Sequence, residues 1–239
     1  MSAGLAGAVE RSPGGRRSGW TLAALLVALG SLFVACEGDR PPGTLMDGSL
    51  ALRPPVELEH TSGPAILTKT RVVIDIRDRP HSPSAACLRA HRDAHAPRQF
   101  VERTGVAASS VTFSDTSGLY GCDDGLGAHE NGRRFCGASF GRLYGGRLRD
   151  PRLDLAGCRT SAGDPIGFIW VQPARTTRYV AVAQPGYVEV YEVAGRLPVR
   201  IATTAGVEVE DARTSFDVSE HDVRGRLVRS ETINAVVAG

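Results

Sequence analysis

The chain has 239 residues, of which 42% are hydrophobic and 23% charged, so it can bury a core and general disorder is excluded. The net charge of +2 comes from 28 basic and 26 acidic residues. The first 35 residues hold three of the basic and one of the acidic residues, which leaves 25 of each sign. Because the residues after position 35 have no net charge, they have no overall electrostatic attraction for nucleic acid, and we expect no nucleic-acid partner.

The chain opens with the layout of an export signal. Arg16 and Arg17 precede an uncharged run, Trp20–Ala35, that ends at Cys36. This run of 16 residues is shorter than the roughly 20 that a stable transmembrane helix needs. Its last residues, Leu-Phe-Val-Ala-Cys, resemble the lipobox of bacterial lipoproteins.

The resemblance implies cleavage before Cys36 and a diacylglycerol group on its sulfur, with an acyl chain on the new amine. Two or three chains hold a protein durably on a bilayer, whereas one binds only marginally. We therefore expect a signal peptide over 1–35 and a mature protein anchored to the outer face of the bacterial cytoplasmic membrane. The mature part resembles uncharacterised secreted proteins of high-GC actinobacteria, in keeping with Lys69 as the only lysine.

The mature chain is expected to begin with a tether and then fold. Residues 36–64 are rich in Pro and Gly and have no helical or strand period, which is typical of a semi-extended linker. Alternation of apolar residues over 72–77 predicts the first strand. Ser82 and Pro83 then predict a helix start, and the helical pattern over 86–96 runs to Pro97.

Strand patterns separated by turn residues fill the rest of the chain. The expected strands are Phe100–Arg103, Ser110–Phe113, Leu119–Cys122, Phe135–Phe140, Gly167–Gln172, Tyr179–Ala183, Tyr187–Val193, Val199–Thr203, Thr214–Ser219 and Arg226–Val237. Because no recurrent long helices exist to connect parallel strands, the predicted fold is all-β, an antiparallel β-sandwich or barrel-like region over 65–239 with one short helix.

Two segments of this region resemble each other. The patterns at 111–119 and 215–227 suggest two related modules, over about 65–160 and 161–239. Two hairpins of the same type would show the same likeness, so one module is the other interpretation.

Four cysteines remain beside Cys36, and an even number outside the cytoplasm favours disulfides. Three pairings of Cys87, Cys122, Cys136 and Cys158 are open, and the short loop favours Cys122 with Cys136, leaving Cys87 with Cys158.

Two metal sites are alternatives to this interpretation of the cysteines. One is Cys122, His129 and Cys136, although structural zinc sites place two ligands closer together in sequence. The other is His91 and His95 on the predicted helix, with Cys87 one turn earlier. The expectation is no metal and no cofactor.

One short motif suggests a hydrolase. Gly137–Gly141 fits G-x-S-x-G, in which Ser139 would be the nucleophile and His221, the only downstream histidine, its base. That motif requires a helix after its last glycine, and the glycine-rich sequence that follows predicts none. A small secreted serine hydrolase is therefore the alternative function.

Charge is unevenly placed along the chain. The segment 131–152 carries about +5, and its ligand-binding candidates are Arg133, Arg134, Arg142, Arg147, Arg149 and Arg152. The segment 207–222 carries about −5. Either the two segments form ion pairs with each other, or the arginines remain exposed and available to a ligand. Open guanidinium groups suit carboxylate or phosphate. The leading hypothesis is a non-enzymatic, lipid-anchored domain that binds an anionic envelope component or a protein partner.

Overall fold

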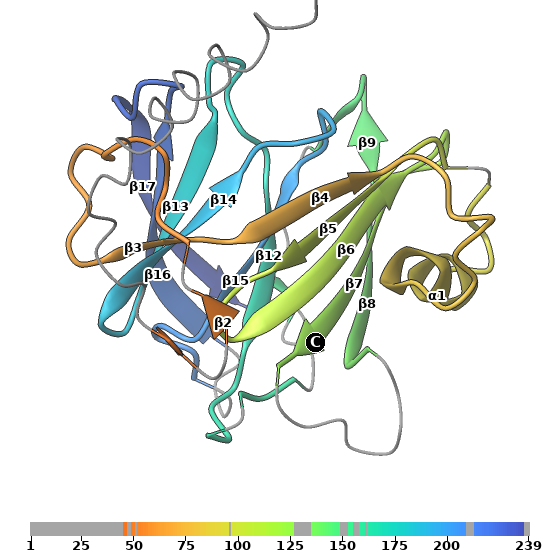
Figure 1. Cartoon of the computed structure of the whole chain (residues 1–239), viewed down its shortest axis with the longest axis horizontal. Helices are drawn as coiled ribbons and strands as arrows, with labels where there is room; N and C mark the ends of the chain where they lie inside the picture. The colour runs from red at the N-terminus through yellow and green to blue at the C-terminus, as the bar shows by residue number, and fades with distance from the viewer. Residues whose placement is uncertain are drawn as a thin grey trace, which may run out of the picture. The chain divides into compact units, whose positions relative to one another are not determined.

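Short runs of alternating and β-branched residues form almost every element of the chain in the computed structural model (Figure 1). The structure describes residues 45–46, 49–50, 52–95, 97–126, 135–148, 153–154, 158–160, 162–208 and 213–236. Contacts group Thr44–Gly239 into one unit. The predicted all-β class with one short helix is confirmed.

The first sheet is antiparallel and has the strand order β4-β5-β6-β7-β8. Its strands are β4 (Lys69–Val73), β5 (Phe100–Thr104), β6 (Ala108–Ser114), β7 (Leu119–Gly125) and β8 (Gly137–Gly141). Neighbouring strands follow one another in sequence, and short turns connect β5 to β6 and β6 to β7, whereas the connection from β4 to β5 contains the helix.

The second sheet has the order β17-β16-β13-β14-β3. Its strands are β3 (Ala65–Leu67), β13 (Tyr179–Gln184), β14 (Tyr187–Glu192), β16 (Arg213–His221) and β17 (Leu227–Val236). All pairs are antiparallel except β3 with β14. Only Thr68 separates β3 from β4, so one stretch of chain borders both large sheets.

A third, central sheet lies between the two large ones (Figure 1). It consists of β11 (Leu153–Asp154), β12 (Gly167–Val171) and β15 (Val199–Thr203). Alternation along β12 turns Ile169 towards the second sheet, where it packs in the same cluster as Val180 and Phe216. It turns Trp170 the opposite way, against Val101 and Leu119 of the first sheet. Every residue of β12 and β15 is therefore buried.

The helix α1 (Pro83–Ala90) covers the outer face of the first sheet. Ser82 caps it by accepting a hydrogen bond from Ala85 N, and Pro83 occupies the first turn, as predicted. The helix ends at Ala90 rather than near residue 96, because the His91 backbone leaves the helical region. The His91 ring instead packs edge-on against Tyr120 of β7, at 5.1 Å between ring centroids.

Three expected boundaries differ from the structure. The strand expected at 72–77 is Lys69–Val73, three described strands come before it, and Ile74 beyond it is 77% exposed. The tether does not extend to residue 64, because Leu58 is buried against the second sheet and Glu59 N donates to Gly225 O. No module boundary lies at 160, because β3 pairs with β14 and β11 with β12 across it.

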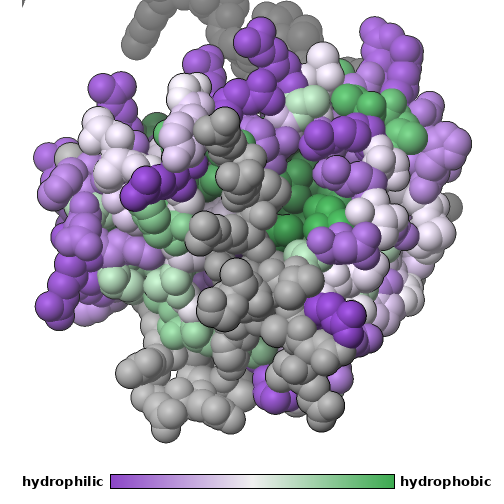
Figure 2. Space-filling view, turned by 180° about the vertical axis from the view of Figure 1, so that it is seen from behind, coloured by the Kyte–Doolittle hydropathy of each residue, from purple (hydrophilic) through white to green (hydrophobic). Residues whose placement is uncertain are grey.

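Two small hairpins complete the described part. One pairs β1 (Leu45–Met46) with β2 (Ser49–Leu50), and the other pairs β9 (Leu143–Tyr144) with β10 (Arg147–Leu148). No helix among the described residues has the length and apolar character needed to cross a bilayer. Seen from behind, the surface is mainly hydrophilic, and apolar residues gather in a recessed area near its centre (Figure 2).

Candidate functional site

The hairpin β9–β10 presents two of the predicted arginines. Its turn is Gly145-Gly146, whose φ angles of +59° and +75° suit the two-residue turns that join antiparallel strands. Tyr144 is paired directly with Arg147 and Leu143 with Leu148. Because alternate residues face opposite sides, Leu148 is buried whereas Tyr144 and Arg147 are exposed.

Arg142 and Phe140 lie just before the hairpin in sequence. Both are exposed, and Phe140 has 49% of its surface accessible. We call Phe140, Arg142, Tyr144 and Arg147 the hairpin patch. It combines two cationic and two aromatic side chains within eight residues of sequence.

The hairpin is fixed to the core at its base. Leu148 N donates to the side-chain oxygen of Gln172 at 2.9 Å. The Leu148 side chain packs with Leu119, Trp170 and Leu197. The hairpin patch is therefore held by the layers beneath it.

Three described acids of the acidic segment, Asp217, Glu220 and Asp222, have partners outside this patch. Glu220 is 1% exposed and accepts hydrogen bonds from Ala174 N, Thr177 Oγ1 and Arg229, all outside the patch. Asp217 accepts from Thr232 Oγ1 on the neighbouring strand β17.

Asp222 is also engaged locally. It accepts from Arg226 N and Arg224 N in its own turn, and these bonds lower its pKa. In the described ranges, no ion pair reaches Arg142 or Arg147. Pairing of the two charged segments is thus not found there, while Arg133, Arg134, Arg149 and Arg152 lie outside the described residues, as does Cys36.

Ser139 and His221 do not form a catalytic pair. Ser139 lies within strand β8, is 6% exposed, and its Oγ has no hydrogen-bond partner in the described part of the chain. No helix follows: β8 leads into the β9–β10 hairpin. The nucleophile position of the motif is therefore not reproduced.

His221 is paired with a different serine. Its Nδ1 donates to Gly225 O at 3.2 Å, and its Nε2 contacts Ser219 Oγ at 2.9 Å, so both ring nitrogens are engaged. The ring is fully buried, and burial lowers the His221 pKa. Because Nδ1 donates to a carbonyl and the ring is neutral, Nε2 accepts the Ser219 hydroxyl proton. The contact holds β16 at the irregularity between Glu220 and His221.

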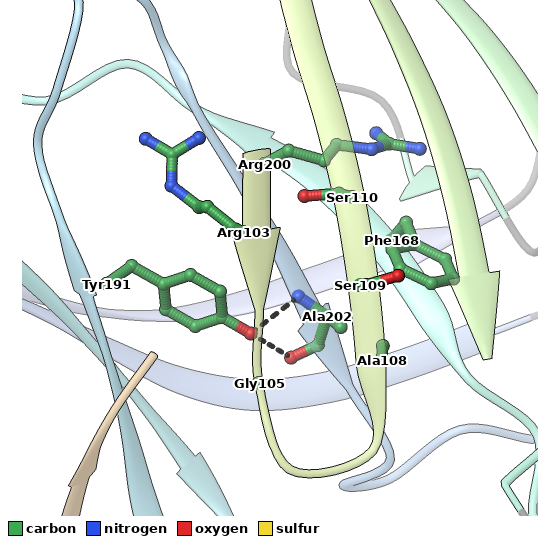
Figure 3. Close-up of a pocket in the computed structure, with 9 residues that line it drawn as sticks. All are labelled: Arg103, Gly105, Ala108, Ser109, Ser110, Phe168, Tyr191, Arg200 and Ala202. Carbon is green, nitrogen blue, oxygen red and sulfur yellow. Dashed lines mark hydrogen bonds between the residues drawn. The ribbon is translucent and has the colours of Figure 1, made fainter. Parts of the chain in front are cut away.

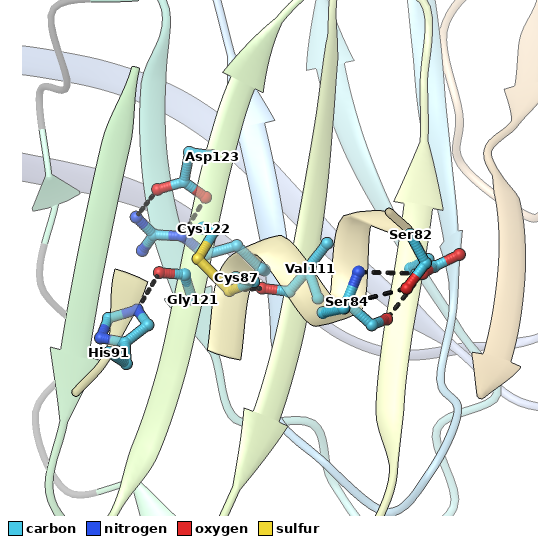
Figure 4. The surroundings of a disulfide bond; sticks show 11 residues. Ser82, Ser84, Cys87, His91, Val111, Gly121, Cys122 and Asp123 are labelled. Carbon is cyan, nitrogen blue, oxygen red and sulfur yellow. Dashed lines mark hydrogen bonds and ion pairs between the residues drawn. A yellow bond between two sulfur atoms is a disulfide. The ribbon is translucent and has the colours of Figure 1, made fainter. Parts of the chain in front are cut away.

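All four cysteines form disulfides, but not in the preferred pairing. The bonds are Cys87–Cys122, with 5.7 Å between Cα atoms, and Cys136–Cys158, with 5.3 Å. Alternation on β7 turns Cys122 to the outer face, directly under α1, where Cys87 lies (Figure 4). Nearness in sequence was thus a poor guide to pairing.

The two metal sites were alternatives to the disulfides. Helix α1 ends before His91, so His91 and His95 do not share a helix face, and His129 lies outside the described residues. Cys87, His91 and Cys122 do lie together, with ligand atoms within 4.8 Å of one another. The two sulfurs are bonded to each other, and His91 Nε2 donates to Gly121 O at 2.9 Å (Figure 4).

A buried polar network that the sequence analysis missed joins the layers. Glu189 of β14 accepts from Val106 N at 2.9 Å and from Tyr191 Oη at 2.9 Å. Tyr191 Oη in turn accepts from Ala202 N at 3.1 Å, on the unpaired edge of β15 (Figure 3). Burial raises the pKa of Glu189 to about 7. A Glu-x-Tyr alternation in a strand was the only available signal, and it is a weak one.

Comparisons with protein-family models, with curated proteins and with solved structures found no match for this chain.

Proposed function

We propose that this chain is a lipid-anchored, extracytoplasmic β-domain that binds an anionic component of the cell envelope through the hairpin patch. The observation that carries the proposal is the pairing of exposed Arg147 with exposed Tyr144, beside Arg142, with no described acid neutralising either arginine. The proposed role is binding rather than catalysis, since Ser139 Oγ meets no base among the described residues and a hairpin rather than a helix follows β8.

The side chains of the patch suit a ligand that carries carboxylate or phosphate. A guanidinium group donates two parallel hydrogen bonds to either anion. An aromatic ring next to an arginine adds a flat apolar surface for the rest of the ligand. Residues paired across an antiparallel hairpin have Cβ atoms about 5 Å apart, so Tyr144 and Arg147 reach one ligand together.

Two observations support an extracytoplasmic location. Disulfides persist in oxidising compartments, and both bonds here involve the folded region. The lipobox-like sequence ending at Cys36 supplies an export and anchoring signal. A domain held at the membrane by acyl chains meets the anionic polymers and headgroups of the envelope without needing high affinity.

The test is cosedimentation of the full mature protein with isolated cell-wall material, before and after the anionic polymers are extracted. We expect the Arg142→Gln/Arg147→Gln variant to bind at least tenfold more weakly than wild type. Arg98→Gln/Arg175→Gln is the matched control, because both arginines are exposed and the net charge changes equally. Equal loss in both double variants, or binding that survives polymer extraction, would contradict the proposal.

A further inference from the structure

A small pocket lies between the first sheet and strand β15, next to the turn that joins β5 to β6 (Figure 3). Arg103, Ser109, Ser110, Phe168, Tyr191 and Arg200 are among the residues that line it. About 10 Å³ is open to the centre of a water-sized sphere, which is room for roughly one water or one small ion. Gly105 and Ser109, which also line it, are partly exposed.

Arg103 is the unusual group in this pocket. It is 2% exposed, and its Nη2 donates to Glu192 O at 3.3 Å. Its Nε and Nη1 atoms are buried without a hydrogen-bond partner anywhere in the described ranges. Donors buried unsatisfied on a charged group cost more than those on a neutral one. Burial accordingly lowers the pKa of Arg103 to about 10, which still leaves it protonated at neutral pH.

The carboxylates near this pocket have other partners. Glu189 accepts from Val106 N and Tyr191 Oη. Asp123 accepts two hydrogen bonds from Arg200. The Glu192 carboxylate lies close enough to favour the charged form of Arg103, but its own ion pair is with Arg178. The positive charge of Arg103 therefore has no carboxylate hydrogen-bonded to it among the described residues.

We propose that this pocket binds a single halide-sized anion, chloride under physiological conditions, with Arg103 as its principal ligand. An anion accepts the unused N–H groups and balances the buried charge at the same time. The hydroxyl groups of Ser109 and Ser110 supply further donors. The small volume favours a monatomic anion over phosphate, sulfate or an organic acid, and the pocket shares no residue with the hairpin patch.

Crystals of the full mature protein grown with bromide in place of chloride test this directly. An anomalous difference peak at hydrogen-bond distance from the Arg103 guanidinium supports the proposal. A peak at exposed arginines only, or a water without anomalous signal beside Arg103, overturns it. This experiment uses the wild-type chain and does not depend on whether a variant folds.

Thermal unfolding gives an independent measurement. With gluconate replacing chloride at constant ionic strength, the melting temperature of wild type is expected to fall, because chloride binds the folded state. Arg103→Met should lose this dependence, and Arg103→Lys should keep part of it. Arg98→Met is the control, since it removes an exposed arginine outside both the pocket and the hairpin patch and should respond as wild type does. A chloride response that persists unchanged in Arg103→Met would overturn the assignment.

Discussion

Arg200 of the central sheet and Asp123 of the first sheet form a two-point ion pair that is sealed from solvent. Arg200 Nε lies 3.1 Å from Asp123 Oδ1, and Nη2 lies 2.6 Å from Oδ2, with side-chain exposures of 0% and 1%. The Trp170 ring lies 4.8 Å from the guanidinium carbon, which adds a cation–π contact. The pair fixes how the central layer lies against the first sheet.

Removing one partner of this pair should destabilise the fold strongly. We expect Arg200→Met to lower the free energy of unfolding by about 3–5 kcal/mol, because the buried Asp123 carboxylate then loses both hydrogen bonds from the guanidinium group. The double variant Asp123→Leu/Arg200→Met should lose clearly less than the sum of the two single losses. Urea unfolding measures both quantities.

The exposed pair of Arg77 with Asp75 provides the control, since both side chains are at least half exposed. Arg77→Met should leave the free energy of unfolding almost unchanged. Additive losses for the buried pair would show that Arg200 and Asp123 do not act together.

Glu189 should make stability depend on pH in the opposite direction from an ordinary paired carboxylate. Burial raises its folded-state pKa to about 7 from an ordinary 4.5. Its contribution is therefore fully present below pH 4.5 and is lost as the pH rises through about 7. The loss is on the order of 3 kcal/mol at 1.36 kcal/mol per pKa unit.

The difference between wild type and Glu189→Gln isolates this contribution from all other titrating groups. Gln keeps a carbonyl for Val106 N–H, and its amide can donate to Tyr191 Oη. We expect the variant to gain stability relative to wild type as the pH is raised from 5 to 8. A difference that stays constant over that interval would mean that Glu189 titrates normally.

The two disulfides should differ in their reactivity. Cys87 and Cys122 are both 0% exposed beneath α1, whereas Cys136 is exposed and only its partner Cys158 is buried. Because a thiolate must reach a sulfur to break the bond, mild reductant should open Cys136–Cys158 first. Alkylation followed by peptide mass analysis gives the order, and simultaneous opening under native conditions would contradict it.

Loss of the buried disulfide should also cost stability. Its sequence separation of 35 corresponds to about 4 kcal/mol in the chain-entropy account. Cys87→Ala/Cys122→Ala is compared with Cys136→Ala/Cys158→Ala by urea unfolding. The first pair should lose at least as much, since its loop is the longer one.

Local patterns predicted the strands because each strand alternates buried and exposed residues and is followed by residue types that favour turns. The turns after β6 and β16 are both closed by an aspartate: Asp115 accepts from Ser117 N and Gly118 N, and Asp222 from Arg224 N and Arg226 N. This shared device explains the likeness between 111–119 and 215–227, which are two hairpins of similar type.

Long-range relationships were beyond such patterns. Arg200 lies in the middle of β15, and an arginine is ordinarily expected on the surface. It is buried because it pairs with Asp123, which is 77 residues away in sequence. The parallel pairing of β3 with β14 and the disulfide partner of Cys122 likewise depend on how sheets stack.

The end of the helix could not be predicted from sequence, because His91 is held by tertiary contacts with Tyr120 and Gly121. The sequence predicted that Arg142 and Arg147 bind a ligand, but it did not predict that they are exposed. Their exposure depends on how Leu148 packs beneath the hairpin.

Cys36 should carry the attachment of the protein to the membrane. The lipobox-like sequence implies that the mature chain starts at Cys36 with a diacylglycerol thioether and an acylated amine. Two or three buried chains, at roughly 0.8 kcal/mol per methylene, make release negligible.

Intact-mass measurement of the membrane fraction should therefore give a chain beginning at residue 36 plus lipid. Cys36→Ala should remove the lipid and leave the leader uncleaved by the lipoprotein peptidase. A wild-type chain that still begins at Met1 with an unmodified Cys36 thiol would refute the anchor and weaken the envelope location that rests on it.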